Sequence, residues 1–526
     1  MTVRRALSIA ALLVLLVQGI ATAHEERPSQ FPDGTGSVPK YRQSGPSIVV
    51  CKNSSARRIR QLPAALRSYN QQLFARCQYH DIQAAVDAVT KQGTRILVLP
   101  GVYSEKPSTA PLSEECAPLA DKRANGDGPL TYEEQKRCPH VENLIGIFGD
   151  DPADEDIKCD NALCGLQIEG TGKKPLDVVI DGKFAKLNAI RADRADGAYF
   201  RNFTVERSEF NSLYVIETDG YAIDRVLARW NDEYGFLTFS SDHGLYQDCE
   251  AYGNGDSGIY PGSASDLPAG TRPAVEIRRC RSHHNTLGLS GTAGNNIYAH
   301  NNRFYKNIAG VSLDSFFPNH PGLPQDSSTF VHNLVYSNNQ DYYQYYRDGT
   351  CADMTEARKR FEEGVVCPSV PMAIGTGFFL AGGNENVYRE NRVWNNWRFG
   401  AMQFWVPAYF HGDDDPTHQN DTSNFNRYVK NIMGVTPGGS VKPNGKDFSW
   451  DVEGAGNCWQ DNVAAPGRDI TYQPPTPEVF PTCDDPTKDE FRPAPLVSQY
   501  GSCATWSREN YEPPGCDWMQ RPAKPE

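Results

Sequence analysis

The chain has 526 residues, with 45 glycines, 37 prolines and 11% aromatic residues. Its formal net charge of -13 argues against a nucleic-acid-binding protein, because phosphates require a basic surface. This composition favours a turn-rich β protein over a helical bundle.

The amino-terminal residues have the pattern of a secretory signal peptide. Arg4 and Arg5 precede an apolar run over residues 6–20, and a small-residue cleavage pattern ends at Ala23. We therefore expect residues 1–23 to be removed and the mature chain to be secreted. We expect no membrane span, since no later stretch offers about eighteen uninterrupted apolar residues.

Cysteine usage agrees with an oxidising compartment. The chain has 14 cysteines, and several form close pairs within loops: Cys116 and Cys138, Cys159 and Cys164, Cys351 and Cys367, Cys503 and Cys516. We expect disulfide bonds that close these loops. A zinc site is the alternative, although the chain has no C-x-x-C pair.

Residues 24–79 are expected to form an amino-terminal extension, followed by a helical cap. Residues 81–89 have helical apolar spacing, and residues 94–103 read as a strand that ends in a turn. A helix at this point would cover the open end of a stack of strands and prevent the first strand from pairing with another molecule.

Between residues 200 and 400 the chain repeats itself. Six asparagines mark the repeat, with successive steps of 23, 31, 22, 31 and 58 residues: Asn231, Asn254, Asn285, Asn307, Asn338 and Asn396. The longer steps contain obvious loops, and a period in this range indicates stacked supersecondary units. Stacked asparagines can bond their amides from one unit to the next, and Asn tolerates the left-handed backbone of a tight corner.

A second column of residues lies five positions ahead of these asparagines and is expected to point inward. Its members are Val226, Cys249, Cys280, Asn302, Asn333 and Asn391. In five of the six units a glycine follows the marker asparagine, and an apolar-alternating strand follows the glycine. Turn and strand therefore recur with the same period, which predicts a coil of parallel strands.

The cap, the period and the two columns resemble the pectate-lyase-like superfamily over about residues 80–404. The resemblance implies an all-β, single-stranded right-handed parallel β-helix with a helical amino-terminal cap and long loop insertions. Tyr234-Gly-Phe and residues 251–259 are most similar to mannuronan C5-epimerases and copper-processing periplasmic β-helix proteins. Where the epimerase motif has Asp-Pro-His, this chain has residues 237–239, Leu-Thr-Phe.

The coil is expected to span residues 80–440, interrupted by insertions at 104–165 and 341–371. The second insertion contains a predicted helix over 355–363. Residues 441–526 are rich in proline and cysteine and read as an irregular wrap or tail. Long loops on a rigid coil commonly shape a binding groove.

Three acidic residues near the corners form a candidate calcium site. Asp232 and Glu233 follow one marker asparagine and Asp256 follows the next, so stacking would place them about 4.8 Å apart. Carboxylates at that separation repel one another unless a cation or proton lies between them, which makes Ca²⁺ the expected cofactor. Solvated turn acids are the alternative.

Two Asp and His pairs are candidates for proton transfer. Asp242 and His243 follow one repeat strand, and Asp314 with His320 follow another. Such pairs can abstract and return a proton, as β-elimination or epimerisation of a uronate demands, and Asp242 with Asp314 would supply two carboxylates for hydrolysis. Surface corner histidines without a catalytic role are the alternative.

Arg281 is the candidate that would neutralise a substrate carboxylate. It lies in a basic row with Arg278 and Arg279, and arginine in that role acidifies the neighbouring carbon. Ion pairs with Asp248 and Glu250 on the neighbouring rung are the alternative.

Aromatic residues are dense over residues 316–346 and 394–410 and favour a glycan ligand, because sugar rings stack on aromatic faces. The first hypothesis is a monomeric, secreted enzyme that acts on a polysaccharide by lyase, epimerase or hydrolase chemistry. The second is a non-catalytic glycan-binding or cell-surface protein. Neither nucleic acid nor a membrane is expected as a partner.

Overall fold

A computed structural model describes residues 27–125, 129–151, 156–268, 270–486 and 501–526. The predicted signal peptide therefore lies outside the described residues. The chain divides into two compact units. The amino-terminal unit comprises residues 29–267 and 272–281, and the carboxy-terminal unit comprises mainly residues 282–526.

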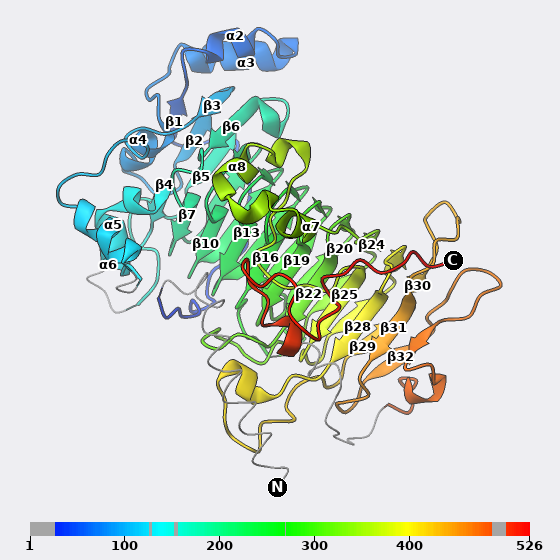
Figure 1. Ribbon diagram of the computed structural model, residues 1–526. Coiled ribbons are helices and arrows are strands. Elements are labelled where there is room, and N and C mark those ends of the chain that lie inside the picture. The colour runs from blue at the N-terminus through cyan, green and yellow to red at the C-terminus, as the bar shows by residue number, and fades with distance from the viewer. Residues whose placement is uncertain (1–26, 126–128, 152–155, 269, 487–500) are drawn as a thin grey trace. The chain divides into compact units, whose positions relative to one another are not determined.

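In the amino-terminal unit, consecutive strands go in turn to three parallel sheets, named A, B and C. Sheet A has the order β1 (Ser47–Val50), β2 (Arg95–Val98), β5 (Gln167–Gly170), β8 (Ala198–Arg201), β11 (Asp219–Asp224), β14 (Asp242–Gln247) and β17 (Val275–Arg278). Sheet B has the order β3 (Gly101–Tyr103), β6 (Val178–Asp181), β9 (Thr204–Glu206), β12 (Leu227–Arg229) and β15 (Glu250–Tyr252). Sheet C has the order β4 (Asn143–Phe148), β7 (Asn188–Asp193), β10 (Asn211–Ile216), β13 (Tyr234–Phe239) and β16 (Ser257–Gly262), side by side in Figure 1.

The carboxy-terminal unit has the same three kinds of sheet, and β18 (Arg281–His283) spans the boundary of the two units. Its sheet A contains β20 (Ile297–His300), β23 (Thr329–Val331), β26 (Val387–Arg389), β29 (Arg427–Val429) and β32 (Cys458–Gln460). Its sheet B contains β21 (Arg303–Tyr305), β24 (Leu334–Tyr336), β27 (Arg392–Trp394) and β30 (Ile432–Met433). Its sheet C contains β19 (Leu287–Thr292), β22 (Ala309–Asp314), β25 (Thr376–Ala381), β28 (Phe399–Phe404), β31 (Lys446–Trp450) and β33 (Tyr472–Gln473).

This arrangement is a parallel β-helix, as the repeat predicts. One turn of the coil reads C, A, B, and strands one turn apart pair in register, as Leu213 of β10 does with Ile190 and Phe236. These three side chains are fully buried, because alternate residues of each strand point into the coil. The core is therefore a set of columns that the rung period generates from the sequence.

The asparagine column is a hydrogen-bonded ladder at the corner between sheets B and C. In the amino-terminal unit Asn231 Nδ2 donates to Asn254 Oδ1 at 2.7 Å. In the carboxy-terminal unit Asn307 Nδ2 donates to Asn338 Oδ1 at 3.0 Å, and Asn338 Nδ2 donates to Asn396 Oδ1 at 3.1 Å. The prediction that these asparagines bond their amides from one turn to the next is confirmed within each unit.

The left-handed backbone lies one residue ahead of the marker asparagine and not at the asparagine itself. Trp230 and Ser337 both have φ of 58°, and Asn395 has φ of 56°. The asparagine keeps its side chain inside the coil, where the ladder satisfies its amide, while the preceding residue makes the bend.

The second column is also buried, as predicted, with each member at most 1% exposed. Asn302 Nδ2 donates to Asn333 Oδ1 and Asn333 Nδ2 donates to Asn391 Oδ1, both at 3.0 Å. In the amino-terminal unit Cys249 and Cys280 of this column form a disulfide bond. The corner between sheets A and B is thus joined by amides in one unit and by a covalent bond in the other.

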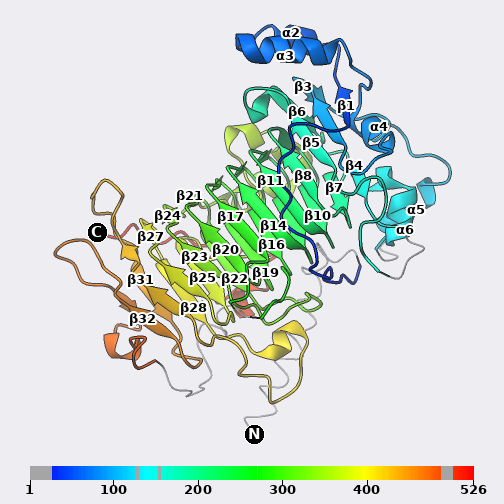
Figure 2. The ribbon, with the colours of Figure 1, turned by 180° about the vertical axis from the view of Figure 1, so that it is seen from behind.

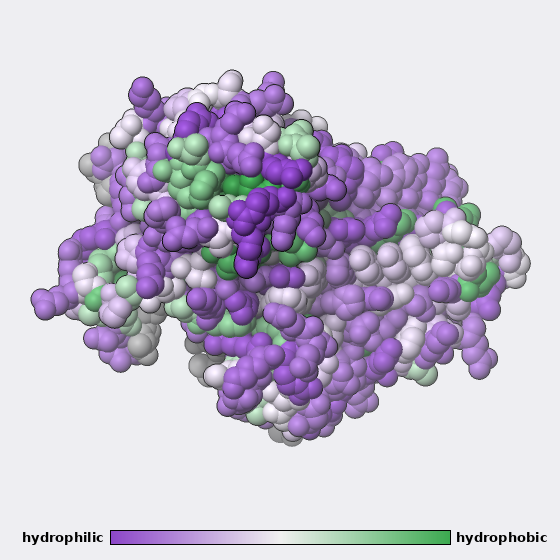
Figure 3. All heavy atoms as spheres, turned by 90° about the horizontal axis from the view of Figure 1, so that it is seen from above, coloured by the Kyte–Doolittle hydropathy of each residue, from purple (hydrophilic) through white to green (hydrophobic). Residues whose placement is uncertain are grey.

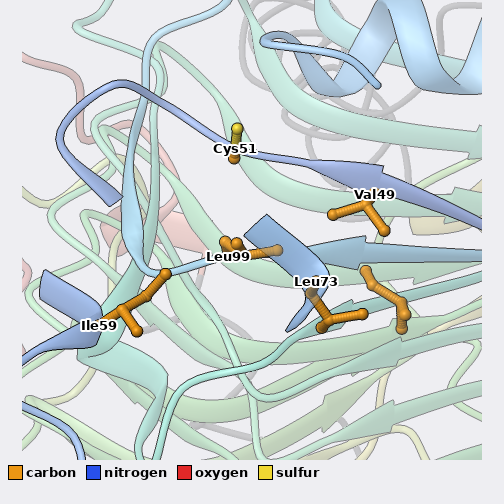
Figure 4. Packing of buried hydrophobic residues seen from close by; sticks show 6 residues of the cluster. Val49, Cys51, Ile59, Leu73 and Leu99 are labelled. Atoms are coloured by element: carbon orange, nitrogen blue, oxygen red, sulfur yellow. The ribbon is translucent and has the colours of Figure 1, made fainter. Parts of the chain in front are cut away.

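Helices cover the first turn of the coil. Figure 4 shows Ile59 of α2 (Ser55–Ile59) and Leu73 of α3 (Ala64–Phe74) packed together with Val49 and Leu99. Each of these four residues is at most 2% exposed. The predicted cap helix is α4 (Ile82–Asp87), whose Gln83 side chain bonds the backbone of Gly146 in β4. Three helices, rather than the single one expected, close this end.

The coil differs from the expected boundaries in three places. Its first strand begins at Ser47 and not near residue 80, and β31, β32 and β33 extend it beyond residue 440. Strand β4 interrupts the expected 104–165 insertion, leaving α5 (Ala117–Ala124) and α6 (Tyr132–Arg137) on one side of it. The loop at 341–371 carries α7 (Gln344–Arg347) and α8 (Met354–Arg358), and the helix predicted over 355–363 is divided into α8 and a 3-10 helix at Phe361–Glu363.

The expected loop disulfides are present, and they join the two members of each of the four close cysteine pairs. The other three bonds join Cys51 to Cys77, Cys249 to Cys280 and Cys458 to Cys483. All 14 cysteines are therefore paired, which leaves no thiolate for the zinc alternative. Among the described residues, no helix is long and apolar enough to cross a membrane, and the face in Figure 3 is mainly hydrophilic with separate hydrophobic patches.

Candidate functional site

Asp242 and His243 open strand β14 on sheet A of the amino-terminal unit. They follow the corner formed by Ser240 and Ser241, so they lie at the start of a strand and not in a loop. Asp242 is 1% exposed, whereas the side chain of His243 is 14% exposed. The pair is thus held by a rigid element and His243 still reaches the surface.

His243 Nδ1 lies 2.6 Å from Asp219 Oδ1, one turn back in the coil. Asp219 and Asp242 are direct partners in the parallel register of β11 and β14. One ligand-type atom from each of Asp219, Asp242 and His243 lies within 4.8 Å of the others. The structure therefore adds Asp219 to the predicted pair.

The sequence carries a signal that identifies Asp219. Asp196, Asp219 and Asp242 follow one another at steps of 23 residues, the step that separates Asn231 from Asn254. The Asp219 amide donates to Asp196 Oδ1 at 2.7 Å, and burial raises the pKa of Asp196 to about 6. The column thus continues for three turns.

Both oxygens of Asp242 are bonded to Arg272. The guanidinium nitrogens Nη1 and Nη2 donate to Oδ1 and Oδ2 at 2.6 and 2.7 Å, and this carboxylate raises the pKa of Arg272. A bidentate pair of this kind holds both groups in place. Asp242 is therefore occupied as a structural anchor, and His243 is the member of the pair with a group available for chemistry.

His243 occupies a left-handed backbone position. The equivalent residue in the two preceding turns is glycine, Gly197 with φ of 77° and Gly220 with φ of 89°, whereas His243 has φ of 46°. A side chain in this conformation costs about 1–2 kcal/mol relative to the right-handed region. A histidine therefore stands at a position where glycine folds with less strain.

Asp314 ends strand β22 and is almost fully buried, with 7% exposure. Burial raises its pKa, while hydrogen bonds from Thr292 Oγ1 at 2.8 Å and the Phe316 amide at 3.2 Å act in the opposite direction. The charge of His320, itself 3% exposed, also acts on this carboxyl. Asp314 and His320 both lie in the carboxy-terminal unit, and their pairing for proton transfer stays a prediction.

Arg281 is engaged by an ion pair. Its Nη2 lies 2.7 Å from Glu250 Oε2, and Arg279 Nε lies 2.8 Å from Asp248 Oδ1. These ion pairs join neighbouring rungs, which is the alternative to a catalytic role for Arg281. The Arg281 side chain is 53% exposed, so the pair is a solvated one.

The candidate calcium ligands have different environments. Asp232 and Asp256 are 6% and 2% exposed. Asp256 accepts hydrogen bonds from the hydroxyls of Tyr234 at 2.9 Å and Ser257 at 2.7 Å. Asp232, Glu233 and Asp256 do not belong to either metal-compatible cluster within the described ranges, and calcium binding stays a prediction.

Aromatic residues serve three roles. Phe330, Tyr388 and Tyr428 stack inside the coil at 5.4 and 4.8 Å, and Tyr343 packs against Trp506 near the carboxyl end. A third row lies outside sheet B of the carboxy-terminal unit. It consists of Tyr305, Tyr336 and Trp394, with ring separations of 5.0 and 4.3 Å and nearly parallel planes.

Comparison with known proteins identifies the fold. The family model for the right-handed β-helix region matches residues 164–320, so the coil is a right-handed parallel β-helix, as the sequence predicts. No curated protein matches the chain.

The solved structures to which this chain is similar include three polysaccharide-modifying enzymes. The A-module of the mannuronan C-5 epimerase AlgE4 from Azotobacter vinelandii has 12% identity and a TM-score of 0.42, covering 74% of this chain and 92% of that one. A rhamnogalacturonan lyase has 10% identity and a TM-score of 0.37, with 81% and 89% coverage. Pectate lyase Pel9A has 11% identity and a TM-score of 0.33, with 84% and 80% coverage. Values this low do not transfer an activity to this chain.

Proposed function

We propose that this protein is a polysaccharide-modifying enzyme in which His243 transfers a proton and Asp219 positions it. The observation that carries the proposal is the 2.6 Å contact between His243 Nδ1 and Asp219 Oδ1. Within the described residues, His243 Nε2 has no hydrogen-bond partner. The imidazole therefore has one fixed nitrogen and one nitrogen available to a ligand.

This geometry suits general acid–base chemistry. Asp219 accepts the Nδ1 proton, which leaves the Nε2 lone pair as the base. When Nε2 takes a proton, the Asp219 carboxylate stabilises the resulting imidazolium, and the same nitrogen can then return the proton. Such a pair can serve elimination or epimerisation of a uronate, or it can activate water for hydrolysis.

Two further observations support this assignment. Gly197 and Gly220 occupy the position of His243 in the two preceding turns, so the backbone there does not require an imidazole. Tyr305 and Tyr336 of the carboxy-terminal unit are half-buried, stacked rings, and partly exposed aromatic faces of this kind are ones that glycans contact.

The test is His243→Gly, which gives this position the residue found in the two preceding turns. Arg225→Gly is the matched control, because Arg225 has φ of 55° at another corner of the same unit. Both variants are incubated with a panel of uronic and neutral polysaccharides. Unsaturated products are read by ultraviolet absorbance and hydrolysis by new reducing ends.

We expect His243→Gly to fold as stably as the parent and to lose at least a hundredfold in product formation, while Arg225→Gly keeps its activity. Equal product from His243→Gly and the parent would remove His243 from the mechanism. If the parent gives no product from any polymer but still binds one, the protein is a glycan-binding β-helix and the enzymatic proposal is wrong.

A further inference from the structure

We propose that the outer face of sheet A in the amino-terminal unit binds an extended neutral glycan, and that residues 29–43 occupy this face as an internal competitor. We call residues 29–43 the strap. The identity of the ligand as a glycan rests on the proposed function, whereas the competition does not. Figure 2 shows the dark-blue strap crossing β8, β11 and β14 ahead of β1.

The strap is held by side chains of successive turns. The Gln30 amide donates to Glu217 Oε1 at 3.0 Å, and the Gly36 amide donates to Asp219 Oδ2 at 2.7 Å. Further along, Gln167 accepts from the Arg42 amide and donates to the Arg42 carbonyl, both at 3.0 Å. An extended chain thus lies across the strands and satisfies its backbone through side chains that face outward.

Apolar contacts accompany these bonds. Val38 and Tyr41 of the strap pack against Tyr199, Ala222 and Leu245 of sheet A. The rings of Tyr41 and Tyr199 have their centroids 5.9 Å apart. The face beneath the strap therefore combines an aromatic ring with hydrogen-bonding groups, which are the two elements of a sugar-binding surface.

The strap passes over the candidate active site. Asp219, which positions His243, is the acceptor for the Gly36 amide, and a Cβ at Gly36 would lie 2.7–2.9 Å from the Asp219 carboxylate atoms. Gly34 is close to the ion pair of Asp242 and Arg272, since a Cβ at Gly34 would lie 3.4 Å from Asp242 Oδ2. A ligand on this face and the strap therefore require the same groups.

The strap has the features of a removable segment. None of residues 29–43 is buried, and none belongs to a helix or strand. Its backbone makes no ladder with the sheet and depends on a few side-chain acceptors, so its displacement breaks no secondary structure. As a tethered segment it competes at a high effective concentration, which release of the tether removes.

The acceptors indicate which ligand can replace the strap. Glu217 and Asp219 accept from strap amides, and Glu169 Oε1 accepts from the Tyr41 hydroxyl at 3.0 Å. A replacement must therefore offer hydrogen-bond donors without negative charge, as the hydroxyl groups of a neutral polysaccharide do. The nearby arginines are already paired with these acids, Arg194 with Glu217 at 2.9 Å and Arg95 with Glu169 at 3.4 Å, so they are not available to the carboxylates of a uronic polymer.

The experiment releases the strap from the full protein. A specific protease site is placed at Gly45, which is exposed and where an added Cβ would meet no atom within 4 Å, and dissociation is followed by mass spectrometry. Binding of soluble neutral glucans and mannans, and of polygalacturonate, is measured before and after cleavage. Gly36→Ala, which crowds Asp219, is compared with Ser37→Ala, whose side chain is exposed.

We expect cleavage to tighten binding of a neutral polymer at least tenfold, a synthetic peptide of residues 29–43 to reverse the gain, and Gly36→Ala to mimic it where Ser37→Ala does not. Unchanged binding after release, or a strap that stays bound even in cleaved Gly36→Ala protein, overturns the competition. Tighter binding of polygalacturonate overturns the ligand class. Binding is also measured on the His243→Gly variant. A failure of the catalytic proposal can therefore be distinguished from a failure of the competition between the strap and a glycan.

Discussion

Glu105 provides a sharp test of how burial of charge affects the stability of the capped end. It follows β3, is fully buried, and its Oε2 accepts from the Gln83 amide at 3.0 Å in the first turn of α4. Its Oε1 has no hydrogen-bond partner among the described residues. Burial raises the pKa of Glu105 from 4.5 to about 7.

The sign and size of the effect follow from proton linkage. The folded protein holds this proton at pH values where the unfolded chain has lost it. The stability that protonated Glu105 contributes is therefore complete below pH 4.5 and is lost as the pH rises to about 7. The difference between the two pKa values corresponds to about 3 kcal/mol.

The perturbation is Glu105→Gln, which keeps the shape and removes the titration. Urea unfolding, together with hydrogen exchange of the α4 amides, is measured for parent and variant at pH values from 4.5 to 8. As the pH rises from 4.5 to 8, the parent should lose about 3 kcal/mol in its free energy of unfolding relative to the variant. Glu114→Gln, an exposed carboxyl of the same unit, is the control, and a parent-to-variant difference that does not change with pH would refute the reasoning.

Three further variants test the coil itself. Asn307→Ala should cost about 3 kcal/mol in urea unfolding, because it breaks the buried bond to Asn338 and leaves ladder groups unpaired; a loss below about 1 kcal/mol would contradict a structural ladder. Replacing Cys249 and Cys280 together by alanine should lower stability by about 3 kcal/mol, and an unchanged urea midpoint would show that this bond contributes little. Trp518→Ala, at a site 1% exposed, should cost about 3–5 kcal/mol, and an unaltered melting temperature would mean that the carboxyl-terminal segment does not depend on this ring.

The sequence determined the coil because its information is periodic and local. The 23-residue step fixes which residues become vertical neighbours, so the ladder of Asn231 and Asn254 and the buried column with Cys249 could be predicted without coordinates. Close cysteine pairs likewise indicated disulfide bonds within loops, and the structure decided the connectivity, such as that of Cys159 with Cys164.

Only the tertiary structure decided which polar groups meet on the surface. The same 23-residue step relates Asp219 to Asp242, but the partner of each depends on loops that have no period: Arg272 comes from one and Gly36 from the strap. Asp242 is bonded to Arg272, and the carboxylate that contacts His243 Nδ1 is that of Asp219. Non-periodic segments reach the coil by chain paths that side-chain spacing does not encode, so the site could be predicted only in part.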